Sequence, residues 1–299
     1  MTRQTHDEFA KEYLEELLKP FGTIEKGKNI ASERREIDIF FVPNELNSDD
    51  ISNLGFLGEL TKTSCLIEPF RNPCTQIEIR SCLLKLYTIH GEVLRQAKRE
   101  QTKESRVKLA FLWILSPTFS TRILDDFEGK LGENEQKGVY FFPKGLFAAV
   151  IVIHQLPINQ DTLWLRVLGK GTTQKQAVEE LVELPKTSPF KANLLELLAN
   201  WRKNLELRDN KTRDDLKVIM NLSPAYLQDR ELWLEEGKLE GKLEGKLQLI
   251  ENLLKVRFQS LDEELKQIIP VMVKLPDDEL SRLLLTLNRE ELLIRFKLN

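Results

Sequence analysis

Hydrophobic residues follow two different periods along the chain, and the change of period separates a sheet-containing part from a helical part. Before residue 172, apolar runs of strand length cover 36–42, 64–68, 109–115, 139–142 and 146–153. Helical spacing of apolar residues covers 9–18 and 77–99. The link 143–145 is short enough to join the last two strands as an antiparallel hairpin. We therefore expect an α/β (α+β) domain with a mixed sheet over residues 1–171.

From residue 172 onward the apolar residues keep helical spacing, so we expect an all-helical C-terminal region. It divides into a helical extension over 172–228, a long helix over 229–259 and a short helical bundle over 260–299. Ser223 followed by Pro224 matches the start of a new helix. The other start signals combine a capping residue with an acid three positions later, and they lie at Thr5, Ser260 and Asn288.

A repeat of four residues occupies the long helix. Residues 236–247 read EGKLEGKLEGKL, which places Gly237, Gly241 and Gly245 in register. A four-residue period drifts by about 40° per repeat on an α-helix, which disfavours a heptad coiled coil. Three interior glycines cost about 3 kcal/mol relative to alanine, so a long helix here needs a compensating contact. Two interpretations stay open, namely a homo-oligomer formed by close approach along the glycines, and a solvated linker helix.

The composition is that of an ordinary soluble protein, with 44 Lys and Arg against 47 Asp and Glu in 299 residues. A net charge of −3 excludes a wholly basic nucleic-acid-binding protein, although it leaves room for a local basic surface. The longest apolar run is too short to span a membrane, and the first residues are too polar for a signal peptide. We therefore expect a cytoplasmic protein whose cysteines, Cys65, Cys74 and Cys82, are buried thiols.

A local basic surface is indicated between residues 71 and 108, where nine Arg and Lys face four Glu, a balance of +5. Arg95, Lys98 and Arg99 are three and four positions apart and share one face of the expected helix 77–99. Such a cationic face could follow the phosphate backbone of DNA. The alternative is a solvated helix end, where cations also complement the helix dipole.

Two acids lie in strand-like segments and could hold a metal ion. Asp38 stands in the middle of 36–42, and Glu68 ends the segment 64–68. Carboxylates on neighbouring strands can bind Mg²⁺, because hard cations take oxygen ligands. A third acid could come from the first helix, as Glu8 or Glu12. The alternative for Asp38 is an exposed strand face that alternates with apolar residues.

Two segments resemble the core of the PD-(D/E)XK nuclease superfamily, and more narrowly its recombination-promoting nuclease and transposase-like group. They are Glu36–Phe41, which reads EIDIFF, and Leu66–Pro73, which reads LIEPFRNP. The resemblance covers about residues 1–160 and implies a restriction-endonuclease-like fold. It also implies metal-dependent DNA cleavage, with Asp38 and Glu68 as Mg²⁺ ligands and catalytic residues and Glu12 in support.

The chain departs from this family at Phe70, because the family has a lysine or glutamine two residues after the second acid. Phenylalanine neither donates a proton nor orients a water molecule. Arg71 could take the role if Pro69 bends the chain, and Lys85 could supply it from the following helix. Two hypotheses follow. The chain is a Mg²⁺-dependent endonuclease-like protein with a degenerate active site, or an inactive nuclease-fold protein that acts as a self-associating interaction module.

Residues 221–227 read NLSPAYL, and leucine-rich helices are expected after the repeat. In these segments the chain is similar to uncharacterised cyanobacterial proteins that carry a C-terminal domain of unknown function, and the similarity extends over the whole chain. It assigns no activity.

Overall fold

The computed structural model describes residues 2–30, 35–44, 50–102, 107–132 and 137–296. Two compact units divide the chain, Met1–Asp229 and Arg230–Asn299. The first unit holds a mixed seven-stranded sheet with helices, and an all-helical region follows the sheet, as expected. Among the described residues, no helix is both long and apolar enough to cross a membrane.

The sheet combines antiparallel and parallel pairs. Its spatial order is β1-β2-β3-β4-β7-β6-β5, with β3, β4 and β7 parallel to one another and antiparallel pairs on either side. In chain order the strands are β1 (Gly22–Ile30), β2 (Arg35–Pro43), β3 (Cys65–Pro69), β4 (Phe111–Ser116), β5 (Lys130–Leu131), β6 (Val139–Phe141) and β7 (Ala148–Val152). The expected hairpin of β6 and β7 is confirmed.

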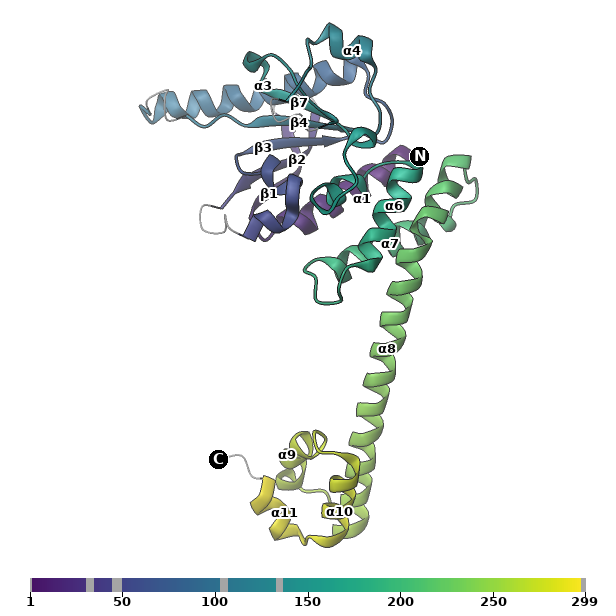
Figure 1. The fold of residues 1–299 in the computed structure, drawn as a ribbon. Coiled ribbons are helices and arrows are strands. Elements are labelled where there is room, and N and C mark those ends of the chain that lie inside the picture. The colour runs from purple at the N-terminus through teal and green to yellow at the C-terminus, as the bar shows by residue number, and fades with distance from the viewer. Residues whose placement is uncertain (1, 31–34, 45–49, 103–106, 133–136, 297–299) are drawn as a thin grey trace. The chain divides into compact units, whose positions relative to one another are not determined.

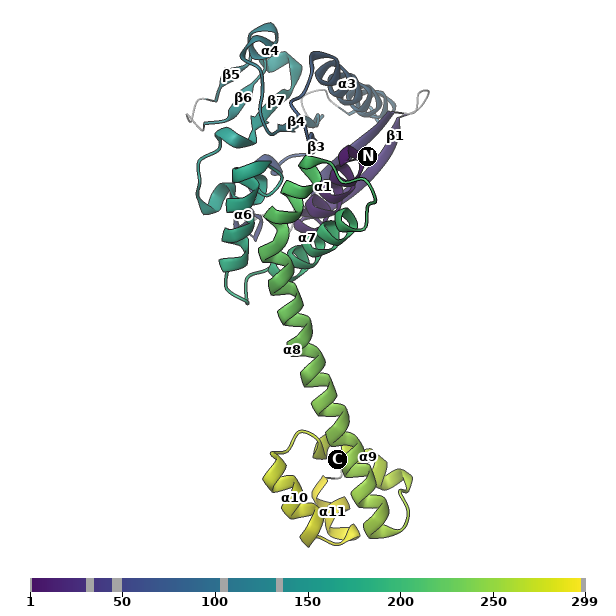
Figure 2. The same cartoon turned by 90° about the vertical axis from the view of Figure 1, so that its right-hand side faces the viewer.

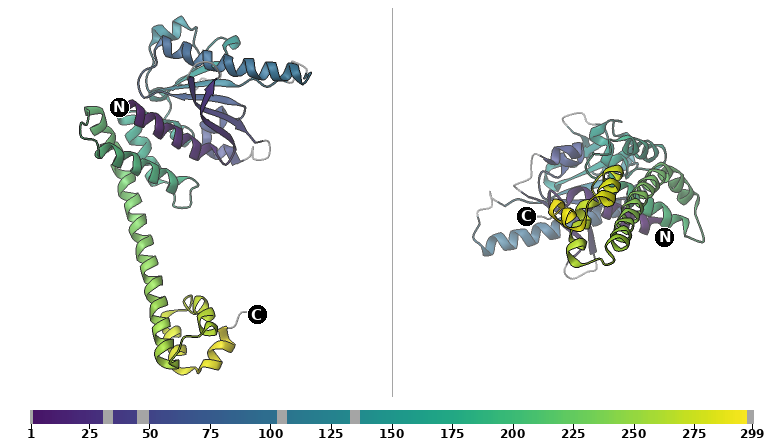
Figure 3. Two further views of the ribbon diagram at one scale, coloured as in Figure 1. Left: turned by 180° about the vertical axis from the view of Figure 1, so that it is seen from behind. Right: turned by 90° about the horizontal axis from the view of Figure 1, so that it is seen from below.

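Helices cover both faces of the sheet. Figures 1 and 3 show α3 and α4 on one side of the sheet and α1 on the other. The helices of this unit are α1 (Thr2–Leu18), α2 (Gly55–Leu60), α3 (Gln76–Arg99), α4 (Thr121–Asp126), α5 (Leu163–Arg166), α6 (Gly171–Glu183) and α7 (Lys191–Glu206). Short 3₁₀ turns lie at Asp50–Leu54, Lys144–Leu146, Ile153–Gln155 and Gln160–Thr162.

The long helix α3 is held to the sheet by its apolar side and begins at a strong cap. Thr75 and Glu78 form a reciprocal capping box, which the sequence analysis did not include. Cys82 and Leu86 of α3 pack in one cluster with Leu66 of β3 and other sheet residues. This packing fixes which α3 side chains lie over the end of β3.

The first strand, β1, was not predicted. It reads GTIEKGKNI and pairs only with β2, so it forms an edge of the sheet. Its charged residues and its central glycine hide the alternation that marks a half-buried strand. The five apolar runs that were predicted as strands correspond to β2, β3, β4, β6 and β7.

The helix α8 (Arg213–Phe258) contains the whole glycine repeat. The predicted helix start at Ser223 and Pro224 is wrong, because Pro224 lies inside α8. The Ser223 hydroxyl donates to the Ile219 carbonyl, one turn earlier in the same helix. Pro224 has no N–H, so one hydrogen bond of the helix is missing at this position, but the helix continues.

The other predicted helix starts have mixed outcomes. The Asn288 start is confirmed, since its side chain accepts from the Glu291 N–H and Glu291 accepts from the Asn288 N–H. The Ser260 start is wrong, because Asp262 caps the next helix by accepting from the Leu265 N–H. The Thr5 start is also wrong, because α1 already begins at Thr2.

The second unit is a small helical bundle. Three helices, α9 (Glu263–Met272), α10 (Asp277–Thr286) and α11 (Arg289–Phe296), pack around the C-terminal end of α8 (Figure 2). Ile250 and Leu254 of α8 enter the core of this bundle. Arg289 binds both Asp262 and Glu264 and so connects α11 to the start of α9.

Candidate functional site

The sheet brings Asp38 and Glu68 together. In the antiparallel pair of β2 and β3, Phe40 lies opposite Leu66 and Ile39 lies opposite Ile67. Asp38 and Glu68 are the next residues beyond the last pair of this register, and the charge of Asp38 acts on Glu68. Directly opposite residues of antiparallel strands project to the same face of a sheet, so the two carboxylates are neighbours. Glu68 is buried, whereas the side chain of Asp38 keeps 23% of its surface exposed.

A lysine from α3 completes this pair. Lys85 donates from Nζ to Glu68 Oε2 at 2.7 Å, and its side chain is 14% exposed. Phe70, at the position where the nuclease family has its lysine, instead packs against the core beneath α3. The structure therefore places Lys85 beside Glu68. Lys85 is one of the two residues considered as a substitute for the lysine that position 70 lacks.

Burial controls the protonation of Glu68. Burial, together with repulsion by the neighbouring Asp38 carboxylate, raises the pKa of Glu68 to about 7 against the opposing effect of Lys85. Burial would lower the pKa of Lys85, but the charge of Glu68 holds that pKa above its usual value. Within the described residues, Glu68 Oε1 has no hydrogen-bond partner. One buried oxygen of Glu68 therefore lacks a hydrogen-bond donor among these residues.

A second lysine, which the sequence analysis missed, contacts Asp38. Lys11 of α1 lies with Nζ 2.9 Å from Asp38 Oδ1 and donates to Glu36 Oε1 at 3.2 Å. No local sequence signal identifies this contact, because it depends on how α1 crosses the sheet. The site therefore consists of Asp38, Glu68, Lys85 and Lys11, with Glu36 at its rim.

The other predicted site residues are not part of this cluster. Glu8 and Glu12 are exposed on α1, and the described part of the chain contains no group of three His, Cys, Asp or Glu side chains that could hold a metal. Arg71 donates to the Gly169 carbonyl and lies 3.6 Å from Asp214, with its guanidinium over the Trp201 ring. The structure does not bring Arg71 to Glu68.

The residues predicted to contact DNA or a second copy of the chain are exposed. Arg95, Lys98 and Arg99 are exposed on the last turns of α3. A Cβ added at Gly237, Gly241 or Gly245 would meet nothing within 4 Å, so these glycines face open space. The three cysteines are buried thiols, as expected.

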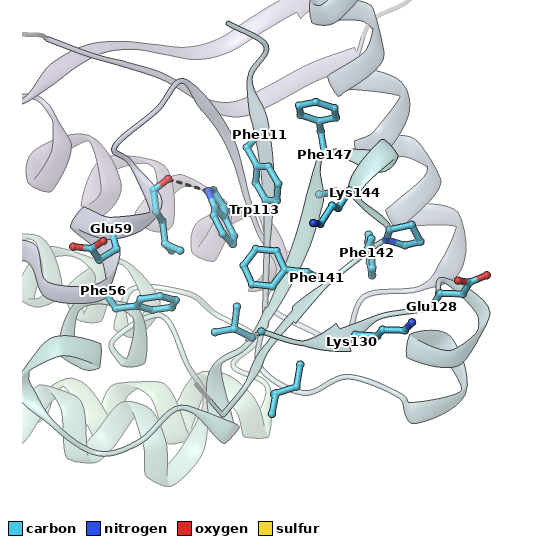
Figure 4. A pocket seen from close by; sticks show the side chains of 16 residues that line it. Phe56, Glu59, Phe111, Trp113, Glu128, Lys130, Phe141, Phe142, Lys144 and Phe147 are labelled. Carbon is cyan, nitrogen blue, oxygen red and sulfur yellow. Dashed lines mark hydrogen bonds between the residues drawn. The ribbon is translucent and has the colours of Figure 1, made fainter. Parts of the chain in front are cut away.

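A large aromatic cavity lies on the other face of the sheet. It has a volume of about 1050 Å³. Figure 4 shows Phe111, Trp113 and Phe141 lining it, with the indole N–H of Trp113 bonded to the Leu60 carbonyl. Trp113 pairs with Ile67, the residue before Glu68, so their side chains point away from the Asp38 and Glu68 face. This cavity contains none of the predicted site residues.

The candidate site fits one hard divalent cation. Mg²⁺ is held in proteins by one or two carboxylates and keeps several water ligands, which matches a site with two acids and no third. The carboxylate oxygen Glu68 Oε1, which has no hydrogen-bond partner among the described residues, is the donor type that such a cation takes. The lysines leave this oxygen open, because Lys85 bonds the other oxygen of Glu68.

Comparison with known proteins adds no relative. No family model matches the chain, and neither the curated proteins nor the solved structures contain a match. The function of the site is therefore argued from the geometry of Asp38, Glu68 and Lys85.

Proposed function

We propose that the chain is a Mg²⁺-dependent DNA endonuclease with a restriction-endonuclease-like fold, of the recombination-promoting nuclease type. The single observation that carries the proposal is the Lys85 contact with Glu68, opposite Asp38. Two acids and a lysine thus share one face although Phe70 occupies the usual lysine position. The mixed sheet with helices on both faces is compatible with this assignment.

Each residue would have a distinct role in the reaction. Asp38 and Glu68 Oε1 would hold the cation, which when bound lowers the pKa of a water molecule and stabilises charge on a phosphate. Lys85 positions Glu68 through Oε2 and favours its ionised form, which a metal ligand requires. Its ammonium group is also close enough to the pair to donate a hydrogen bond to an anion there.

DNA would be held along α3. Arg95, Lys98 and Arg99 lie on the same helix as Lys85, about 15–20 Å further along its axis at 1.5 Å per residue. That distance corresponds to about five nucleotide steps of one DNA strand. These exposed cations would bind the backbone near the cleavage site without reading the sequence.

The proposal is tested by cleavage of supercoiled plasmid DNA with the purified chain in Mg²⁺ or Mn²⁺. We expect nicking or linearisation by the parent, and a loss of about 100-fold or more in Asp38→Asn, Glu68→Gln and Lys85→Met. A matched control is Lys62→Met, because Lys62 forms a similar pair with Glu59 at 2.6 Å on the surface, and both side chains are more than half exposed. Circular dichroism confirms that each variant is folded.

The result that contradicts the proposal is an absence of cleavage by the folded parent in either metal. Equal cleavage by the parent and by Asp38→Asn and Glu68→Gln would also contradict it, since it would indicate a contaminating nuclease. Retained activity in Lys85→Met alone would remove Lys85 from the mechanism and leave the two acids.

The second candidate is an inactive nuclease-fold protein that associates with itself through α8. The open space around Gly237, Gly241 and Gly245 favours it, because no described residue lies within 4 Å of a Cβ added at these glycines. A helix from a second copy could approach them closely. Sedimentation equilibrium of the full chain decides this point, and a monomer at micromolar concentration would contradict self-association.

A further inference from the structure

Lys11 holds the acid that the proposed function assigns to the metal ion. Its Nζ lies 2.9 Å from Asp38 Oδ1 and 3.2 Å from Glu36 Oε1, and its side chain is 20% exposed. Glu36 and Asp38 are two residues apart on β2, so their side chains project to the same face. One ammonium group therefore bridges two carboxylates along the strand.

Each of the two acids that would be metal ligands has an ammonium partner when no metal is bound. Lys11 faces Asp38 and Lys85 faces Glu68, so two ammonium groups oppose the two carboxylates that would be ligands. A divalent cation that approaches Asp38 meets the positive charge of Lys11, whose Nζ lies 2.9 Å from Oδ1. Two cations on one carboxylate repel each other, so binding of a divalent cation to Asp38 favours movement of Lys11 away from this residue.

Glu36 provides the place to which Lys11 can move. The side chain of Glu36 is 56% exposed and already accepts a hydrogen bond from Lys11. A pair with an exposed carboxylate is weak and is easily rearranged. The Lys11 ammonium can thus leave Asp38 and keep a partner, without crossing to another strand.

We propose that Lys11 is a positioning residue that competes with the divalent cation for Asp38 and transfers to Glu36 when the cation binds. This inference rests on the proposed function, because it takes Asp38 and Glu68 as the ligands. It predicts that the parent binds the cation more weakly than its two acids alone would allow. Lys11 would then act as a counter-ion that keeps the acid pair stable while the metal is absent.

The test measures binding of Mn²⁺ to the full chain by electron paramagnetic resonance of the free ion, without DNA. We expect Lys11→Met to tighten Mn²⁺ binding by about tenfold, because the competing charge is gone. Glu36→Gln should weaken binding by about threefold, because the displaced ammonium loses its second partner. Asp38→Asn should abolish binding. The matched control is Lys26→Met, because Lys26 pairs with Glu15 of α1 from the neighbouring strand β1.

Two outcomes separate this inference from the proposed function. If Lys11→Met binds Mn²⁺ no more tightly than the parent while Asp38→Asn loses binding, the role of Lys11 is wrong and the metal site stands. If neither the parent nor Lys11→Met binds Mn²⁺, the metal site and the inference both fail. Lys11→Gln serves as a second variant, and circular dichroism shows whether each variant folds.

Discussion

Lys85 Nζ lies 2.7 Å from Glu68 Oε2, although 17 residues separate the two positions and they belong to different elements. The strand β3 presents Glu68 to the face that α3 covers, and Lys85 reaches it from the helix. The charge that stabilises Glu68 therefore comes from a helix that packs on the strand. This arrangement leaves Phe70 free to contribute to the core.

The first prediction concerns the stability of this buried pair. Lys85→Met should lower the free energy of unfolding by about 3 kcal/mol at pH 8, because the buried Glu68 loses its opposite charge. The double variant Glu68→Gln with Lys85→Met should recover most of this loss, since neither charge remains. Urea denaturation followed by circular dichroism measures both. An equal loss in the two variants would mean that packing of the Lys85 stem, rather than its charge, supports the fold.

The second prediction moves the lysine back to the strand. Phe70 follows β3 with the same alternation as Glu68, and its N–H donates to the Leu115 carbonyl at 2.7 Å. A lysine at this position would therefore share the face of Glu68. We expect Phe70→Lys to restore plasmid cleavage to Lys85→Met to within about tenfold of the parent, at a lower thermal stability because a core ring is lost.

The measurement compares the cleavage rate of the single variant Lys85→Met with that of the double variant that carries both Phe70→Lys and Lys85→Met. The control for a general gain of charge is Lys85→Met with Val42→Lys, since Val42 is an exposed residue on β2. No rescue in a folded double variant would show that the ammonium group must approach from α3.

The sequence analysis located the acid pair because both acids interrupt apolar strand segments that pair with each other. Asp38 lies between Ile37 and Ile39, and Glu68 follows Ile67. Lys85 was one of two substitutes considered, and the structure distinguishes it from Arg71, whose partners are Gly169 and Asp214. The spacing of apolar residues along a helix shows which side of the helix is buried. It does not show which lysine lies over the end of a strand, because that depends on how the helix packs on the sheet.

Neither the contact between Lys11 and Asp38 nor the strand β1 could be predicted from the sequence, and each has its own physical reason. Lys11 reaches Asp38 only because α1 crosses the sheet near β2, a long-range arrangement that leaves no local pattern. β1 is an edge strand with charged residues, and edge strands use such residues to avoid pairing with other chains. The continuation of α8 through Pro224 was missed because tertiary packing can outweigh the loss of one hydrogen bond.

The third prediction is a loss of stability below neutral pH that depends on His6. Burial lowers the pKa of His6 below its usual 6.5, and Arg71 lowers it further, while Asp7 acts in the opposite direction. The unfolded chain therefore binds more protons than the folded chain between the two pKa values. Stability rises with pH across that window and is lost as pH falls below about 6.5.

His6→Leu should remove this dependence. Between pH 7.5 and 5.5 we expect the parent to lose about 1 kcal/mol more than His6→Leu, measured by urea denaturation at each pH. The ring of His6 packs edge-on against Trp201, so leucine keeps an apolar contact there. Equal losses of stability in the parent and in His6→Leu would show that other groups cause the pH dependence.

The fourth prediction separates a structural role of the glycine repeat from an association role. A Cβ added by alanine at Gly237, Gly241 or Gly245 meets no atom of the described residues within 4 Å. The triple variant should therefore raise the stability of α8 by about 1 kcal/mol per position if the helix has no partner. If a second copy approaches the glycines, the same variant should weaken the dimer in sedimentation equilibrium. A change in neither quantity would contradict both interpretations.

The last prediction concerns Arg166, a fully buried side chain whose partners connect three segments of the first unit. Its Nη1 donates to Glu180 Oε1 at 2.8 Å, its Nη2 donates to the Asn159 carbonyl at 2.8 Å, and its Nε donates to the Thr162 hydroxyl at 3.0 Å. Arg166→Met should lower the free energy of unfolding by about 3 kcal/mol, because the Glu180 carboxylate, the Asn159 carbonyl and the buried Thr162 hydroxyl lose their donor at once. The control is Lys175→Met, whose exposed pair with Glu179 should contribute less than about 0.5 kcal/mol. A loss in Arg166→Met as small as that of the control would mean that water satisfies these acceptors, so the guanidinium would not be what joins α5 to α6.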